Sequence, residues 1–192
     1  MWAIPEGMPI FPYEPVITVR GPIIQAQFIE TFVLMSINHQ SLIATKADRI
    51  VRAAAGKAVM EFGGCVGTAC TIAEQLFGIP AMGTMAHSWV QTFDSEYEAF
   101  IKFAELYPDN CVLLVDTYDV LKSGVPNAIR VFDEKKPANK GIRIDSGDIT
   151  YLSNKARKML DEAGHADCTI VVSNSLDEYI IQDLLGQGAC ID

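Results

Sequence analysis

Polar residues whose side chains can take part in catalysis follow several short apolar segments of this 192-residue chain. His87 comes soon after the small apolar residues 81–83, and Asp116, Asp145 and Ser173 each directly follow a further apolar segment. An imidazole can act as a base or as a nucleophile that accepts a phosphoryl group. In parallel α/β folds, the loops after the carboxyl ends of the strands build the active site, and helix amino termini there donate to anions. We therefore take this face as the candidate site.

The elements that would position these residues alternate between short apolar strands and amphipathic helices. The expected strand and helix pairs are 58–62 with 68–77, 81–83 with 95–106, 111–115 with 119–132, 141–144 with 149–163, and 169–172 with 176–185. The helix over 149–163 has the clearest apolar stripe, with Asp148 placed to cap its start and Gly164 past its end. Such alternation predicts parallel strands covered by helices, either in a barrel or in an open doubly wound sheet.

The first part of the chain has a different pattern. Residues 4–21 are rich in proline and alternate apolar with polar side chains, which predicts short strands joined by turns. Pro22 suits the first turn of a helix, and apolar spacing predicts that helix through Leu34, with a second helix over 41–55.

Each candidate site residue also has a purely structural interpretation. A lone histidine near apolar residues, such as His87, is more often a hydrogen-bonded structural residue than a catalytic one. Asp145-Ser146-Gly147-Asp148 fits a turn that caps a helix, and Asp116 and Asp119 allow the same interpretation. The glycine-rich segment 63–68 could bind phosphate through its backbone amides, although its spacing matches neither standard glycine-rich fingerprint.

Composition excludes several functional classes. With a formal charge of −9, the chain lacks the positive charge that drives binding to nucleic acids. Its apolar runs are far shorter than the roughly 20 residues needed to span a membrane, and its first residues do not resemble a signal peptide. Its five cysteines lack the close pairing of zinc or redox sites, so we expect reduced thiols in a cytoplasmic protein.

Two longer motifs resemble the nicotinate phosphoribosyltransferases. They are Gly83-Thr84-Met85-Ala86-His87-Ser88-Trp89 and Gly141-Ile142-Arg143-Ile144-Asp145-Ser146-Gly147-Asp148, and they occur here in the family's order. The resemblance extends to Leu114-Val115-Asp116-Thr117-Tyr118-Asp119 and to Ser173-Asn174-Ser175-Leu176-Asp177-Glu178. It covers nearly the whole chain.

The resemblance implies a type II phosphoribosyltransferase fold, an irregular α/β barrel joined to a smaller, mostly β domain. Residues 1–21 would be a remnant of that β domain, and residues 22–192 would belong to the barrel. The implied reaction joins nicotinate to 5-phosphoribosyl 1-pyrophosphate, giving nicotinate mononucleotide and pyrophosphate at the entry of NAD salvage. ATP hydrolysis and Mg²⁺ would support the reaction, in a homodimer whose active sites lie at the subunit interface.

The family's motifs also imply roles for individual residues. His87 would be phosphorylated by ATP, Asp145 would contact the ribose hydroxyls, and Arg143 would help to hold the carboxylate side of the pyridine. Asp116 would lie in the substrate cleft. The full set implied to bind substrate is Arg143, Asp116, Ser146, Gly147, Thr84, Ser173 and Asn174. No metal ligand is assigned.

The sequence also departs from the family's pattern. A double-arginine segment that helps to bind phosphates is absent between Gly63 and Gly64, and residues 134–140 are shortened. Most of the amino-terminal domain and the glycine loop for the 5′-phosphate are also absent, so we expect a fragment or a gapped chain. A polypeptide of only these 192 residues is expected to have little transferase activity. The alternatives are a nicotinamide or quinolinate phosphoribosyltransferase and a noncatalytic module that binds a nucleotide or supports a partner subunit.

Overall fold

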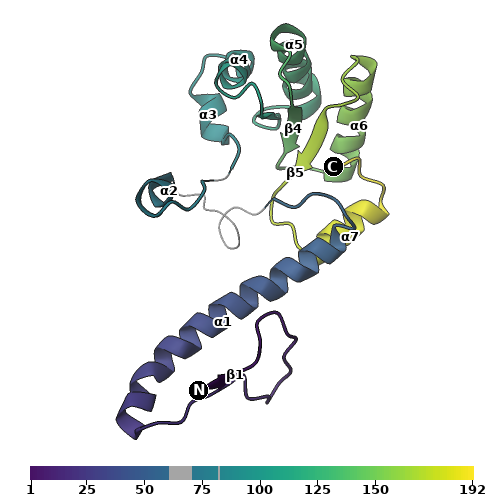
Figure 1. Cartoon of the computed structure of the whole chain (residues 1–192). Helices are drawn as coiled ribbons and strands as arrows, with labels where there is room; N and C mark the ends of the chain where they lie inside the picture. Colours follow the sequence, from purple (N-terminus) through teal and green to yellow (C-terminus); the bar gives the residue numbers. More distant parts are fainter. Residues whose placement is uncertain (61–70, 82) are drawn as a thin grey trace. The chain divides into compact units, whose positions relative to one another are not determined.

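The computed structural model describes residues 1–60, 71–81 and 83–192 of the chain. The chain forms two compact units, Met1–Lys46 and Ala47–Asp192 (Figure 1). The sequence-based division into 1–21 and 22–192 stays a prediction. Several sequence expectations lie outside the described residues: the phosphate-binding segment 63–68, the end of the expected strand 58–62, and Met82.

The first unit contains a small antiparallel sheet and most of a long helix. Strand β1 (Trp2–Ala3), which precedes the predicted range 4–21, pairs with β2 (Ile17–Thr18), which lies within it. Helix α1 (Ile23–Ala53) begins directly after Pro22 and runs without interruption for 31 residues into the second unit. The prediction of two separate helices is therefore wrong. Residues 35–40 contain no proline or glycine that would break the helix.

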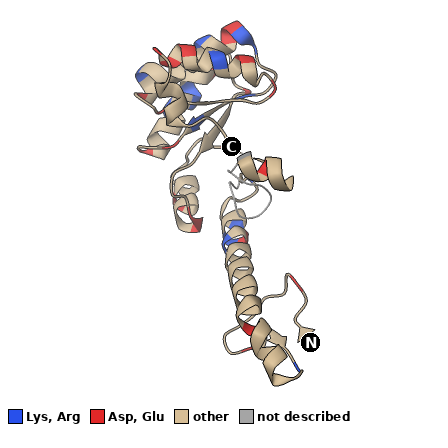
Figure 2. Ribbon diagram, turned by 90° about the vertical axis from the view of Figure 1, so that its left-hand side faces the viewer, with Lys and Arg blue, Asp and Glu red and all other residues tan. Residues whose placement is uncertain are grey.

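One face of α1 exposes large apolar side chains. The exposed residues that share this face are Ile24, Phe28, Phe32, Met35 and Leu42. Their spacing places them within one narrow stripe of an α-helix. Figure 2 shows that this part of the helix carries few charged residues, and Glu30 is the only Asp, Glu, Lys or Arg between Ile23 and Thr45. An apolar stripe of this size is typical of a surface that another polypeptide covers.

The second unit is built on a parallel sheet of three strands in the order β3-β4-β5. The strands are β3 (Cys111–Leu114), β4 (Lys140–Ile144) and β5 (Thr169–Val172), all within one residue of the predicted limits. Residue pairs such as Leu113 with Ile142, and Ile142 with Ile170, set the register. The predicted α/β class is confirmed. Among the described residues, the sheet is open and parallel, and it does not close into a barrel.

Helices alternate with the three strands along this unit, and the helices within residues 96–162 pack against the sheet (Figure 1). The described helices of this unit, in chain order, are α2 (Thr71–Phe77), α3 (His87–Gln91), α4 (Glu96–Leu106), α5 (Val125–Lys135), α6 (Ile149–Glu162) and α7 (Glu178–Gly186). The core between helices and sheet contains fully buried Phe100, Phe132, Ile142 and Leu160. Burial of such side chains contributes about 1.5–3 kcal/mol each, so this unit has its own hydrophobic core.

Helix caps agree well with the sequence. The Asp148 side chain accepts a hydrogen bond from the Tyr151 amide at the start of α6, and Ser95 caps α4 in the same way. Asp119 caps the segment before α5, as expected, but that segment is a single turn of π-helix, η1 (Val120–Gly124). The pattern did not predict this turn, nor the short helix α3 that begins at His87.

Two expected strands are absent from the described residues. Residues 58–60 form no strand, and Ala81 makes only a single β-bridge. Both lie beside residues outside the described ranges. The prediction of strand over 58–60 is therefore wrong, because an apolar run becomes a strand only where a neighbouring strand pairs with it.

Gly124 generates a test of the packing between η1 and the sheet. A Cβ atom at this residue would lie 1.9 Å from the Val115 carbonyl oxygen, so only glycine fits without moving the backbone. We expect Gly124→Ala to lower the free energy of unfolding by about 3 kcal/mol, measured by urea denaturation. The matched control is Gly186→Ala, where a Cβ would meet nothing within 4 Å. Its stability should stay unchanged or rise by up to about 1 kcal/mol. Equal stabilities of the two variants would contradict this packing.

Candidate active site

The candidate site lies at the carboxyl ends of the three parallel strands. Asp116 follows β3, Asp145 and Ser146 follow β4, and Ser173 follows β5. Because the strands are parallel and in register, their carboxyl ends meet at one edge of the sheet. The sequence predicted this gathering from the order of apolar and polar segments alone.

His87 joins this edge through a contact with Asp116. The His87 Nε2 atom lies 3.1 Å from Asp116 Oδ1. The Asp116 side chain is almost fully buried, at 1% exposure, whereas the His87 side chain is 40% exposed. A carboxylate only accepts hydrogen bonds, so Nε2 is the donor in this pairing, and in the neutral ring Nδ1 carries the lone pair. An exposed imidazole held in this way can act on a bound substrate.

The second oxygen of Asp116 binds the loop after β4. Asp116 Oδ2 accepts hydrogen bonds from the Asp145 amide at 3.0 Å and from the Ser146 hydroxyl at 2.5 Å. One buried carboxylate therefore connects the histidine motif to the second motif. Sequence analysis placed Asp116 in a substrate cleft, and this linking role has no signal in the sequence.

Arg143, inside β4, connects three further segments. Its Nε donates to the Ser173 hydroxyl at 2.8 Å, and its Nη2 donates to Asp145 Oδ1 at 2.9 Å. Its Nη1 donates to the Thr84 hydroxyl at 2.6 Å and to the Met85 carbonyl at 3.2 Å. These bonds use four of the five N–H donors of a guanidinium. Arg143 thus holds the chain before His87 against β4 and β5, a contact that sequence reasoning missed because a backbone carbonyl has no sequence signature.

The side chain of Asp145 is an ionised carboxylate whose orientation is fixed by hydrogen bonds. Its Oδ1 accepts from Arg143 and from the Ser173 hydroxyl, which is a very short contact. Burial opposes ionisation of the Asp145 carboxyl, but the hydrogen bonds from Ser173 and Arg143 outweigh it and keep the pKa below its ordinary value. The site therefore holds a carboxylate whose orientation is set by two donors.

Gly147 and Asn174 lie on the loops around these side chains. Gly147 has φ +84°, and a Cβ there would lie 2.9 Å from the Leu152 side chain, so the turn after Ser146 requires glycine. Asn174 and Ser175 both adopt left-handed backbone conformations, with φ values of 87° and 48°. Consecutive non-glycine residues of this kind are costly and tend to lie at functional loops. Among the described residues, no hydrogen bond connects Gly147 or the Asn174 side chain to the Asp116 and Arg143 network.

A cavity of about 560 Å³ lies beside the chain that leads to His87. Its lining residues are Ala81, Gly83, Thr84, Met85, Ala86, Trp89, Phe103, Leu106, Tyr107, Asn110 and Val112. The hollow is half open to solvent, and its lining mixes polar groups with the apolar side chains of Trp89, Phe103 and Leu106. Because Arg143 binds Thr84 and Met85, the wall of the cavity is continuous with the charged network.

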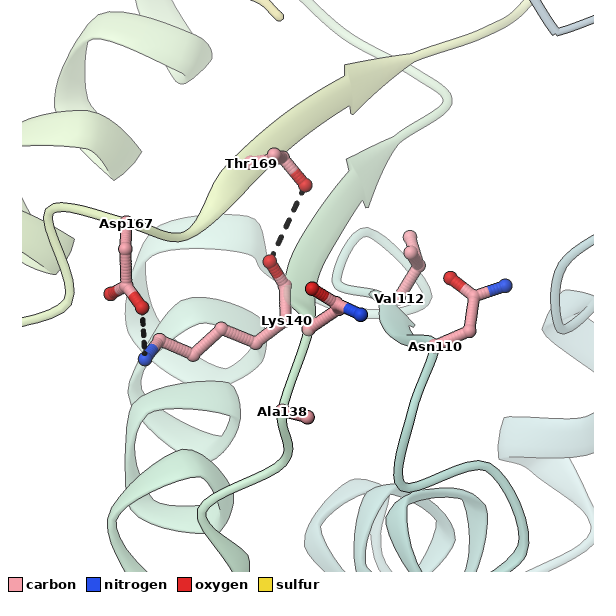
Figure 3. Close-up of a pocket in the computed structure, with 7 residues that line it drawn as sticks. Asn110, Val112, Ala138, Lys140, Asp167 and Thr169 are labelled. Carbon is pink, nitrogen blue, oxygen red and sulfur yellow. Dashed lines mark hydrogen bonds and ion pairs between the residues drawn. The ribbon is translucent and has the colours of Figure 1, made fainter.

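A second, smaller pocket lies at the amino ends of the strands and shares Asn110 and Val112 with the first cavity. It has a volume of about 230 Å³ and includes Asn110, Lys140, Asp167 and Thr169 in its lining (Figure 3). Lys140 points toward Asp167, and the two form an ion pair at 2.8 Å. Active sites of parallel α/β folds lie at the carboxyl ends of the strands, so we assign no chemistry to this pocket.

The described part of the chain offers no group of three or more His, Cys, Asp or Glu side chains that could hold a metal. Asp116 uses both of its oxygens for protein contacts. None of the helices in these residues is long and apolar enough to cross a membrane.

Comparisons of the sequence and of the structure with known proteins point to the same family. A nicotinate phosphoribosyltransferase of Bacillus subtilis (strain 168) is 45% identical over 213 residues, which cover 100% of this chain and 43% of the relative. A nicotinate phosphoribosyltransferase of Mycobacterium tuberculosis is 44% identical over 216 residues, with 100% and 46% coverage. The crystal structure of human nicotinic acid phosphoribosyltransferase matches with a TM-score of 0.81 and 25% identity, over 98% of this chain and 53% of that chain.

The chain is related to the nicotinate phosphoribosyltransferases. It spans less than half the length of the curated relatives it matches. A nicotinate-nucleotide pyrophosphorylase from Pyrococcus furiosus has a similar fold, with a TM-score of 0.65 and 26% identity over 80% of this chain and 45% of that chain. These neighbours confirm the expected fold and the resemblance noted in the motifs. No family model matches the chain.

The relatives also carry residues that this chain lacks within the matched span. The match to the B. subtilis protein extends over 213 residues, more than the 192 residues of this chain. This difference agrees with the expectation of a gapped chain, and the deletions between Gly63 and Gly64 and within 134–140 stay predictions.

The hydrogen bond from Ser173 provides a test of the electrostatics of the site. Because the folded pKa of Asp145 is lowered, its ionisation stabilises the fold above the ordinary carboxyl pKa, and this contribution is lost as pH falls through the lowered pKa. We expect Ser173→Ala to raise the pKa of Asp145 toward its ordinary value, so that the contribution is lost at higher pH. An NMR titration of the Asp145 carboxyl carbon measures the change. The control is Ser146→Ala, which removes a hydroxyl bound to Asp116 instead. A Ser173→Ala titration that superimposes on the wild type would refute this assignment.

Proposed function

We propose that this chain carries the reaction centre of a nicotinate phosphoribosyltransferase. The reaction joins nicotinate to 5-phosphoribosyl 1-pyrophosphate and releases pyrophosphate, with ATP hydrolysis through a phosphohistidine at His87. The observation that carries the proposal is the single network of His87, Asp116, Asp145 and Arg143 at one edge of the sheet. The relationship to proteins that bear this name supports it.

Asp145 is suited to stabilise the reacting ribose. When the bond between the ribose carbon and pyrophosphate breaks, positive charge develops on the ribose carbon, and nicotinate nitrogen then forms the new bond there. A carboxylate that is already fixed stabilises such charge without reorganising during the reaction. The bonds from Arg143 and Ser173 hold the Asp145 carboxylate in this state, and its Oδ2 carries no bond to another described residue. Asp145 would contact the ribose hydroxyls from this position.

The contacts of Arg143 with the described residues leave one of its N–H groups for a substrate. In our proposal this donor helps to hold the carboxylate side of the pyridine, while the other four hold the loops. Ser146, Gly147, Thr84, Ser173 and Asn174 would form the rest of the substrate-binding surface, and the buried Asp116 carboxylate would position the loops of this surface from beneath. The division of the guanidinium between protein and substrate would orient the ring relative to Asp145.

His87 is the proposed phosphoryl acceptor. Its Nδ1 lone pair attacks the terminal phosphorus of ATP, the bond from that phosphorus to ADP breaks, and water later accepts the phosphoryl group. Asp116 supports this role because it fixes the ring and accepts from Nε2. A phosphoryl group on His87 adds negative charge beside the ribose site, which changes the binding of charged substrates. This change provides a route for coupling ATP hydrolysis to synthesis.

Mg²⁺ is proposed to enter with the substrate phosphates. It would offset the negative charge of the leaving pyrophosphate. Mg²⁺ usually keeps several waters and binds one or two carboxylates plus substrate phosphates. Asp145 Oδ2 fits such a partial role, and the described residues provide no complete cage of protein ligands.

We also propose that the protein is a cytoplasmic homodimer with active sites at the subunit interface. The exposed stripe of Ile24, Phe28, Phe32, Met35 and Leu42 supports association with a second copy. Sedimentation velocity of the purified protein tests this proposal, and a monomer at all concentrations would contradict it.

Phosphorylation of His87 tests the proposed function. After incubation with ATP and Mg²⁺, we expect the intact mass of the chain to rise by one phosphoryl group, and His87→Asn to prevent this rise. The matched control is His39→Asn, on the exposed surface of α1, which should be labelled like the wild type. In a longer protein that contains this chain, nicotinate mononucleotide should form from nicotinate and not from nicotinamide or quinolinate, whereas the 192 residues alone should give little product. Labelling that persists in His87→Asn would exclude the phosphohistidine, and product from nicotinamide or quinolinate alone would reassign the substrate.

A further inference from the structure

Glu96, in the first turn of α4, is buried away from the proposed reaction centre. Its exposure is only 5%, and its Oε2 accepts hydrogen bonds from the Ser123 hydroxyl, a very short contact, and from the Asn127 amide at 3.0 Å. Its Oε1 is also buried and has no hydrogen-bond partner among the described residues. Burying a carboxyl group is costly unless hydrogen bonds compensate for the lost water, and here only one of the two oxygens receives them.

Both partners of Glu96 belong to the irregular segment after β3. Ser123 lies in the π-helical turn η1, and Asn127 lies in the first turn of α5. In η1, the Asp119 carbonyl accepts from the amides of both Ser123 and Gly124, so the turn is one residue wider than an α-helix. Single π-turns of this kind are rare, and they frequently lie at functional sites.

The π-helical turn η1 packs directly against the residue that follows β3. Gly124 packs so closely on Val115 that no side chain fits between them. Val115 is fully buried, and the next residue is Asp116, whose carboxylate binds His87 and the loop after β4. The position of η1 therefore sets the end of β3 and the direction in which Asp116 leaves the sheet.

Helix α4 also contacts the short helix that begins at His87. The Trp89 indole nitrogen, in α3, donates to the Ala99 carbonyl of α4 at 3.2 Å. One helix thus fixes α3 through Ala99 and η1 through Glu96. The two groups of the His87–Asp116 pair are located relative to each other by this shared support.

We propose that Glu96 is a positioning residue for the His87–Asp116 pair. It anchors Ser123 and Asn127, and through Gly124 and Val115 it holds Asp116 within hydrogen-bonding distance of His87. The relevance of this role to phosphoryl transfer rests on the proposed function. The positioning itself is a property of the folded chain and can be measured without turnover.

The exchange of the His87 Nε2 proton with water tests this role. NMR detects this proton in labelled protein, and its exchange is slowed while it is bonded to Asp116. We expect Glu96→Ala to accelerate the exchange at least tenfold, because loss of the anchor lets Asp116 move away from the ring. Glu96→Gln keeps a side-chain oxygen that accepts from Ser123 and Asn127, so it should exchange like the wild type.

Tyr97→Phe is the matched structural control. Tyr97 is the next residue of α4, and its hydroxyl bonds to Glu134 of α5 at 2.5 Å, so this variant also loses a link between these two helices. It does not touch η1, and we expect no change in the His87 signal. If folded Glu96→Ala exchanges slowly, or if Tyr97→Phe exchanges as fast as Glu96→Ala, the proposal is wrong. If Glu96→Ala does not fold, exchange of the His87 Nε2 proton is measured in Ser123→Ala instead. Fast exchange in that variant supports the role of Glu96, and slow exchange overturns it.

Discussion

The buried carboxylate of Asp116 is the interaction on which the rest of the site depends. Each of its oxygens is committed to a different segment, one to His87 and the other to the loop of Asp145 and Ser146. A carboxylate at 1% exposure is stable only when such donors replace water. The same requirement that stabilises Asp116 therefore forces the histidine and the aspartate loop together.

Arg143 is the positively charged residue that links segments of the site, as Asp116 is the negatively charged one. It carries the only guanidinium or ammonium group in the described network, and it is shared among Ser173, Thr84, the Met85 carbonyl and Asp145. Three strands and the segment before α3 thus meet around two charges of opposite sign. This network is well suited to a ribose and a ring, but it lacks the positive charge that a pyrophosphate group needs. Further donors must come from outside it, in agreement with the incomplete span of the relatives that the chain covers.

The sequence was sufficient where local chemistry decides the structure. Alternation of strands and helices located β3, β4 and β5, and the polar residues after them indicated the correct edge of the sheet. Asp148 was correctly expected to cap α6, because capping depends on residues only three apart.

The sequence was insufficient where distant contacts decide the structure. The π-turn η1 depends on the fit of Gly124 against Val115 and on Glu96 from another helix, so no local pattern predicts it. The role of Asp116 as a link between two motifs depends on which atoms meet after folding. Its sequence pattern was equally compatible with a helix cap, as it was for Asp119, which does form one.

Hydrogen exchange of the Asp145 amide in Asp116→Ala is the most direct test of this central link. The Asp145 amide donates to Asp116 Oδ2, whereas the neighbouring Val115 amide donates to the Arg143 carbonyl within the sheet. A hydrogen bond to a charged group contributes about 1.5–3 kcal/mol, so its loss should accelerate exchange of the Asp145 amide roughly tenfold or more. The Val115 amide should stay protected in the same sample. Unchanged protection of the Asp145 amide would show that the loop is held without Asp116, and would contradict the account.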